Sequence, residues 1–139
     1  MAAKSVPRFQ QVLLPILREG LGPGVAVRSW IDDIDHRTYP MVNIRRIGGT
    51  RDGNFPNKLD HPVVEITAYT DEGLIETEEL YSEALDVLYE AQRKQILTPA
   101  GYITNITETM GMTQFSSLFI DTWRVQGLIR LGIRPLRTS

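Results

Sequence analysis

Residues 62–95, PVVEITAYTDEGLIETEELYSEALDVLYEAQRKQ, contain the two patterns that decide the fold. In residues 62–70 apolar and polar side chains alternate, which predicts a β-strand with one buried face. In residues 77–95 the apolar side chains recur every three or four positions, which predicts an amphipathic helix. The stripe expected to face the core consists of Leu80, Ala84, Val87, Leu88 and Ala91. A strand that leads into such a helix predicts a sheet with a helix packed against it.

The sequence after this helix predicts two more strands. Residues 102–107 are the first candidate, and Gly111 with its polar neighbours is expected to form a connection. Residues 118–133 alternate strictly, which predicts a long strand. One side of it would carry Trp123, Val125, Gly127, Ile129 and Leu131, and the other side Thr122, Arg124, Gln126, Leu128 and Arg130.

The first part of the sequence predicts a helix, two strands and a long loop. Residues 9–17 carry an apolar stripe typical of a helix, and Pro15 is expected to kink or end that helix. Residues 25–31 and 40–47 are β-branched and alternating, and the turn-rich segment between them favours an antiparallel pair. Residues 48–58 are rich in glycine and predict a long loop, of the kind that is usually functional or mobile.

These elements predict an α+β fold, with an antiparallel or mixed sheet and two main helices packed on one of its faces. The length of 139 residues fits one domain that covers residues 1–139. The chain has no cysteine, which excludes disulfides, thiolate nucleophiles and zinc sites with cysteine ligands. No apolar run approaches the roughly 20 residues of a membrane span, and no signal peptide is apparent, so we expect an intracellular product with no membrane partner.

The charges are segregated along the chain. Residues 59–92 contain ten acidic residues and no lysine or arginine, whereas residues 1–58 carry nine basic and five acidic side chains. After Asp121 the chain has four arginines and no acidic residue. Separated charges of this kind allow copies of one protein to meet head to tail. The alternative is a solvated acidic helix face with scattered arginines.

The sequence offers few groups for catalysis. Its densest titratable cluster is Asp32, Asp33, Asp35 and His36, which lacks the glycine and the distal glutamate of a calcium-binding loop. Short carboxylates are common in turns because they bind nearby backbone amides. We therefore expect no enzyme activity, metal or cofactor, and a small metal-dependent hydrolase or nuclease that uses this cluster is a remote alternative.

Nucleic-acid binding has weak support. Arg45, Arg46 and Arg51 lie close together in the sequence, but the sequence pI is about 5.7, and a dedicated binding domain is usually strongly basic. We expect only transient, sequence-independent contact with passing DNA.

The order of these elements resembles the tail terminator, or tail completion, proteins of long-tailed bacteriophages. The resemblance covers residues 8–135. It depends on a helix before the first strand, the strand PVVEITAY at 62–69, the acidic helix after it, and the closing segment DTWRVQGLIRL at 121–131, which ends near Arg134 and Pro135.

This resemblance implies an α+β fold and a homo-hexameric ring that caps the tail tube, ends its polymerisation and forms the joint to the head or neck. The implied partners are other copies of the chain, the tail tube protein and a neck or connector protein, with DNA passing through the lumen. The implied location is the virion tail or neck, and the host cytoplasm during assembly. Another head-tail connector or a head-completion neck protein is the alternative.

Two groups of residues are the candidate contacts of such an assembly. The subunit interface would pair acidic residues of one copy with basic residues of its neighbour: Glu76, Glu79, Glu83 and Glu90 with Arg124 and Arg130 or with Arg45 and Arg46. The loop at 48–58 would contact the tail tube or the neck through Arg51, Asn54, Phe55 and Lys58.

Overall fold

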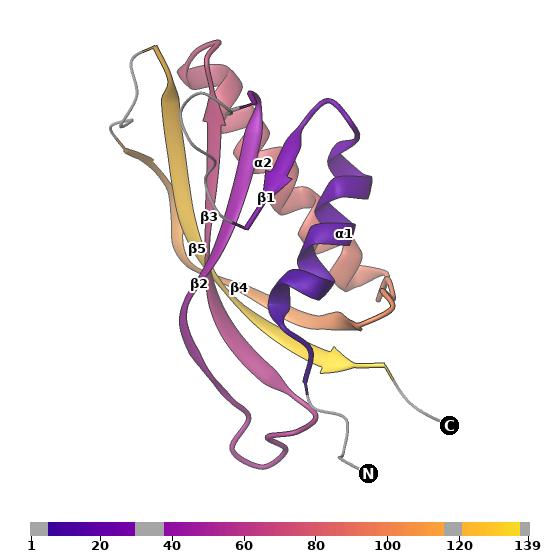
Figure 1. Ribbon diagram of the computed structural model, residues 1–139. Helices are drawn as coiled ribbons and strands as arrows, with labels where there is room; N and C mark the ends of the chain where they lie inside the picture. Colours follow the sequence, from indigo (N-terminus) through magenta and orange to yellow (C-terminus); the bar gives the residue numbers. More distant parts are fainter. Residues whose placement is uncertain (1–5, 30–37, 116–120, 137–139) are drawn as a thin grey trace.

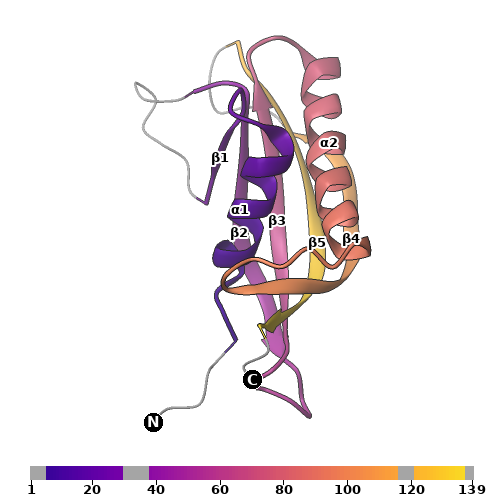
Figure 2. The ribbon, with the colours of Figure 1, turned by 90° about the vertical axis from the view of Figure 1, so that its right-hand side faces the viewer.

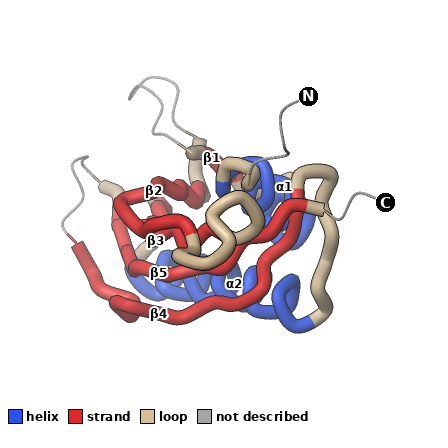
Figure 3. Tube along the Cα trace, turned by 90° about the horizontal axis from the view of Figure 1, so that it is seen from below, coloured by secondary structure: helices blue, strands red, loops and turns tan. Residues whose placement is uncertain are grey.

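The structure is a computed structural model, and it describes residues 6–29, 38–115 and 121–136 (Figure 1). Its elements, in chain order, are α1 (Phe9–Leu21), β1 (Ala26–Arg28), β2 (Met41–Arg51), β3 (Asp60–Thr70), α2 (Leu74–Arg93), β4 (Gly101–Phe115) and β5 (Trp123–Pro135). The strands form one sheet in the order β1-β2-β3-β5-β4, which Figure 3 shows from below. β1 and β2 are parallel, and all other neighbours are antiparallel.

Both helices pack on one face of this sheet, as Figure 2 shows from the side of the helices. The predicted α+β fold with a mixed sheet is therefore confirmed. The core lies between the two layers. It is built from the apolar stripes of α1 and α2 and from the inward side chains of the central strands, which include Val42, Ile44, Val64, Ile66, Ala68, Val125 and Ile129.

The predicted antiparallel pairing of residues 25–31 with 40–47 is wrong. β1 has only three residues and runs parallel to β2, with Val27 opposite Val42. Parallel neighbours need a connection of about a dozen residues that returns the chain to the starting end, and residues 29–40 provide that length. The predicted turn between these strands lies largely at residues 30–37, outside the described residues.

The first helix does not end at Pro15. α1 continues to Leu21, and Gly22 follows it with a positive φ of 81°. Pro15 lies on the exposed side of the helix, while Leu13, Ile16 and Leu17 are buried around it. Burial of this apolar stripe holds the helix together past the proline, because tertiary packing supplies most of the stability of a short helix.

The predicted connection at Gly111 is also wrong, because β4 continues through it to Phe115. The pairing of β4 with β5 shifts register between Glu108 and Met110 and again between Met110 and Thr113. These irregularities let the polar, glycine-containing segment remain paired. The last strand begins at Trp123 rather than at residue 118, and residues 116–120 lie outside the described part of the chain.

The predicted loop at 48–58 is mostly a β-hairpin. Residues 48–51 belong to β2 and pair with residues 60–63 of β3, so that only residues 52–59, called the hairpin tip below, connect the strands. The hairpin tip extends beyond the rest of the sheet (Figure 1). Gly49 has a φ of 91°, and a Cβ atom there would lie 2.1 Å from the carbonyl oxygen of His61. Only glycine fits this close approach.

Candidate assembly surfaces

The four predicted acidic contact residues all lie on α2, but they do not have equal surroundings. Glu76 is in the first turn, where its carboxylate lies beside Gly73 at the helix start. Glu90 forms ion pairs with Arg93 and Lys94, and the hydrogen bonds from these two side chains lower its pKa to about 2. Glu79 and Glu83 are exposed and form no ion pair within the described residues.

A groove of about 650 Å³ lies on the surface where α1, the second half of α2 and residues 96–99 meet. We call it the α1-α2 groove. It is lined mainly by apolar side chains, among them Ile16, Val87, Ala91, Ile96 and Leu97, and its acidic side chains are Glu19, Glu83, Asp86 and Glu90. Leu97 is 64% exposed and Ile96 is 43% exposed. Adjacent exposed apolar residues next to several carboxylates are typical of a surface that another protein covers.

The predicted basic contact residues lie mainly on the opposite face of the sheet, which no helix covers. Arg45 of β2 forms an ion pair with Glu65 of β3 at 3.2 Å, and Glu65 lies opposite Leu128 of β5. Arg130, two residues further along β5, is exposed and has no ion pair in the described part of the chain. Arg45 and Arg130 therefore present guanidinium groups on the side of the molecule away from α2.

Arg124 lies on the same open face, in a hollow of about 520 Å³. Its guanidinium carbon lies 5.3 Å from the centre of the Phe115 ring. Nε of Arg124 and Oδ1 of Asn43, which also lines the hollow, are buried and have no hydrogen-bond partner among the described residues. Buried polar atoms of this kind usually bind a water molecule or another polar group.

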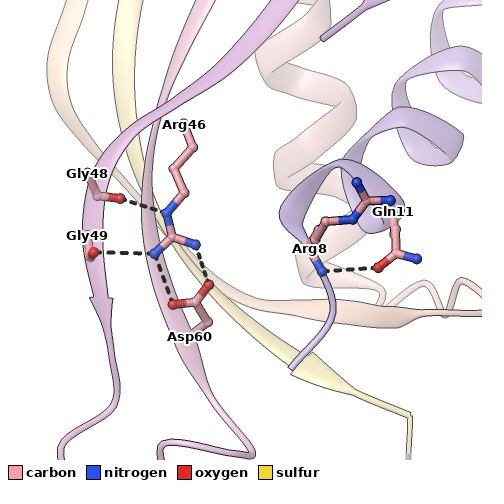
Figure 4. A network of polar contacts seen from close by, with 6 residues as sticks. All are labelled: Arg8, Gln11, Arg46, Gly48, Gly49 and Asp60. Carbon is pink, nitrogen blue, oxygen red and sulfur yellow. Dashed lines mark hydrogen bonds and ion pairs between the residues drawn. The ribbon is translucent and has the colours of Figure 1, made fainter. Parts of the chain in front are cut away.

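Arg46 is not a free surface charge. Its guanidinium forms two hydrogen bonds with the carboxylate of Asp60, of 2.7 and 3.2 Å, and two more with the carbonyl oxygens of Gly48 and Gly49 (Figure 4). In the same view, the side chain of Gln11 accepts a hydrogen bond from the backbone of Arg8 at the start of α1. The sequence grouped Arg46 with Arg45, but a partner for Arg46 already exists within the chain.

The predicted tube-contact residues all lie in the hairpin. Arg51 is the last residue of β2, and Asn54, Phe55 and Lys58 are exposed at the hairpin tip. The carboxylate of Asp52 organises this tip. A hydrogen bond from His61 and two more from the backbone amides of Phe55 and Asn54 lower the pKa of Asp52.

The titratable cluster predicted from the sequence lies outside the described residues: Asp32, Asp33, Asp35 and His36. The structure therefore does not test the hydrolase alternative. Within the described ranges, no group of three or more histidine and acidic side chains is placed to hold a metal ion. No described helix is long and apolar enough to cross a membrane.

Comparison with known proteins identifies the family. The sequence profile of the family described as phage tail termination protein matches residues 5–139. The chain belongs to this family. Two curated relatives are similar to this chain over nearly their whole length. The Gene 22 protein of Mycobacterium phage L5 is 59% identical over 135 residues, which cover 96% of this chain and 97% of that protein. The Gene 22 protein of Mycobacterium phage D29 is 56% identical over 136 residues, covering 97% and 98%.

A solved structure supports the fold of this tail termination family member. A chain from the virion of a native gene transfer agent particle superimposes with a TM-score of 0.52, covering 90% of this chain and 93% of that chain. The two sequences are only 12% identical, so the likeness concerns the fold. The family match over residues 5–139 and the two curated relatives confirm the resemblance to tail terminator proteins expected from the order of elements.

The sequence alone did not reveal several residues of these surfaces. Ile96 and Leu97 are two adjacent apolar residues directly after the predicted helix 77–95, and their position at a helix end could have suggested an exposed apolar corner. The partnership of Asp60 with Arg46 had no local signal, because it depends on the pairing of two strands.

Proposed function

We propose that this protein is a structural component that closes the phage tail tube as a homo-hexameric ring, ends tube polymerisation and joins the tube to the head or neck. Its partners would be further copies of itself, the tail tube protein and a neck or connector protein, with DNA passing through the lumen. The whole chain would act as one unit in the virion, assembled in the host cytoplasm, without catalysis or a cofactor.

The observation that carries this proposal, beside the family, is that two exposed acidic contact residues and three of the basic contact residues predicted from the sequence lie on opposite sides of the sheet. Glu79 and Glu83 lie in the helix layer, whereas Arg45, Arg124 and Arg130 lie on the open face. The acidic residues of one copy therefore cannot meet these arginines within the same chain. A contact between two different surfaces of identical copies is heterologous, and it closes into a ring when the rotation permits.

The α1-α2 groove adds apolar area to this charge pattern. Glu83 and Glu90 both line the groove, so a neighbour that reaches these carboxylates also covers Leu97 and Ile96. Interfaces commonly combine an apolar centre with charged groups at the rim. In this arrangement Glu76 and Glu90 contribute less than Glu79 and Glu83, because their carboxylates already have surroundings that stabilise them.

Termination would result from geometry. One side of the ring would match the last ring of the tube, through Arg51, Asn54, Phe55 and Lys58 of the hairpin, and so stop further addition. The other side would offer a different surface to the neck. Heterologous contacts that close into a ring can do this without any chemical step.

Charge reversal tests the ring contact. We expect the double variant Glu79→Lys with Glu83→Lys to weaken the ring by about tenfold or more at low salt, and less at high salt, because like charges then face each other. Native mass spectrometry over a range of salt concentrations measures this. The control is Asp71→Lys with Glu72→Lys, which makes the same charge change at exposed residues before α2. Rings that are equally stable in both double variants would show that the acidic residues of α2 are only solvated.

Electron microscopy tests where the protein binds in the phage particle. The purified protein should bind the ends of tail tubes and stop their growth. Binding to heads that carry a portal, with none to tube ends, would instead identify a neck or head-completion protein.

A further inference from the structure

The inference rests on the proposed function and concerns the contact with the tail tube. We propose that the hairpin tip is a preformed docking element for the tube protein, held in position by Arg46 and Asp60, and that it binds an apolar hollow bordered by carboxylates. Arg46 and Asp60 are positioning residues in this proposal, and Phe55 is the contact residue.

The four hydrogen bonds of Arg46 join both strands of the hairpin at its base (Figure 4). Asp60 is the first residue of β3, and Gly48 and Gly49 are in the last part of β2. An arginine that binds a carboxylate through two nitrogens has its direction fixed, because the guanidinium is planar and its donors have set angles. The side chain of Asp60 is only 6% exposed, so loss of Arg46 would leave a nearly buried carboxylate without its ion-pair partner.

This position needs such a device because the pairing of β2 with β3 is irregular there. The register shifts between Arg46 and Gly48, which indicates a β-bulge, and a bulge bends the strand and disrupts the ladder locally. Beyond the bulge β3 still pairs with β5 at Val63 and Asp60, and only the hairpin tip extends past the rest of the sheet (Figure 1). Arg46 binds the two carbonyl oxygens that follow the bulge, and so it fixes the direction in which the hairpin leaves the sheet.

The hairpin tip is ordered by its own hydrogen bonds. Asp52 accepts hydrogen bonds of 3.0 Å from the amides of Asn54 and Phe55, and its other oxygen lies 3.1 Å from Nε2 of His61. The carbonyl oxygen of Phe55 accepts two more, from the amides of Lys58 and Leu59. These bonds exist without a partner protein, so the tip needs no folding step when it binds, and the entropic cost of binding is lower.

The ordered tip nevertheless leaves a large aromatic side chain in water. Phe55 is 57% exposed, and Arg51 and Lys58 are exposed near it. Asp52, the acidic residue of the tip, is engaged by His61 and by two amides. An exposed aromatic residue next to cations, on a rigid support, has the chemistry of an interface hot spot. Its complement is an apolar hollow with acidic residues at the rim.

Three single variants test this, each with the binding of purified rings to the ends of tail tubes measured by sedimentation and electron microscopy. We expect Phe55→Ala to weaken binding by about tenfold or more, because it removes the contact itself. We expect Arg46→Met to weaken binding as well while it accelerates hydrogen exchange of the amides of the hairpin tip. The control Arg134→Met removes an exposed arginine at the end of β5 and should change neither.

Asp60→Asn is the second positioning variant, and it should reproduce the effects of Arg46→Met. All variants are compared at a temperature where circular dichroism shows them folded and native mass spectrometry shows the ring. If Phe55→Ala binds tubes like the wild type, the tip is not the docking element. If Arg46→Met and Asp60→Asn leave either hydrogen exchange or tube binding unchanged, the two residues do not position it. A wild-type ring that ignores tube ends would overturn the proposed function instead.

Discussion

The two faces of the sheet carry opposite kinds of side chain, although they belong to the same strands. In β3, Val64, Ile66 and Ala68 point to the helices and are fully buried, whereas Glu65 between them points to the open face and pairs with Arg45. Successive side chains of a strand alternate between the faces, so one sequence serves both needs. The helix-covered face supplies the apolar burial that stabilises the fold. The open face is free to carry charges for contacts with other molecules.

The largest expected effect therefore lies on the helix-covered side. Leu88 of α2 is fully buried, and Leu88→Ala should lower the free energy of unfolding by about 2–5 kcal/mol, because it removes apolar contacts and leaves a cavity. Leu97→Ala removes the same atoms from a residue that is 64% exposed, and should change this free energy by less than about 0.5 kcal/mol. Urea unfolding followed by circular dichroism measures both. If both variants lost the same free energy of unfolding, burial on the helix-covered side would not be the main source of stability in this protein.

A smaller effect is expected at Gly127, where the buried face has no room for a side chain. A Cβ atom at Gly127 would lie 1.9 Å from the hydroxyl oxygen of Tyr81. Gly127→Ala should therefore cost about 1–3 kcal/mol of unfolding free energy. The Tyr81 hydroxyl is buried without a hydrogen-bond partner among the described residues, and its burial raises the pKa of Tyr81 to about 12.

Removal of that hydroxyl should relieve the closest contact of the new methyl group, although Cζ of residue 81 would still lie 2.8 Å away. Tyr81→Phe alone is expected to be nearly neutral, since it deletes a group with no partner, and in the double variant it should recover part of the loss. Thermal unfolding of the two single variants and the double variant gives the coupling energy. Additive effects would show that the backbone of β5 moves away from Tyr81, so that the buried face is less rigid than its packing indicates.

The same comparison explains how much the sequence could predict. Local periodicity predicted the strand at 62–70, the helix α2 and the strand β5. Each has a periodic pattern because one side of the element is buried. The pairing direction of β1 was missed, because it depends on a crossover and not on the strand residues. The predicted loop at 48–58 and the predicted connection at Gly111 were wrong for a related reason: pairing with β3 and β5 keeps glycine-containing segments extended as strands.

The candidate contacts were predicted less completely than the fold. The sequence shows that the acidic residues gather on and around the predicted helix, but it does not show the ion pairs of Glu90 with Arg93 and Lys94. The partnership of Arg46 with Asp60 depends on the pairing of β2 with β3, and Arg45 and Arg46 have different surroundings because successive side chains of a strand alternate between its faces. The α1-α2 groove combines parts of the chain that are distant in sequence. A sequence shows the chemistry of each side chain, but it does not show which side chains of other helices and strands lie next to it.

The smallest effect is expected from a charge on the exposed surface. Glu90→Gln removes the ion pairs with Arg93 and Lys94, but exposed pairs are screened by water and salt, so the melting temperature at pH 7 should change very little. The sign of its pH dependence is fixed. The pKa of Glu90 is lowered from 4.5 to about 2, so any stabilisation is present above pH 4.5 and is lost as the pH falls toward 2.

Melting curves of Glu90→Gln and the wild type at pH 7 and near pH 2 test this, and the small difference at pH 7 should vanish at the lower pH. A large loss of stability at pH 7 would show that surface charges of α2 hold the fold together. Charge reversals on α2 could then no longer separate assembly from folding, because both would weaken together. A small loss leaves the acidic residues of α2 available for contacts between copies, at little cost to the chain that carries them.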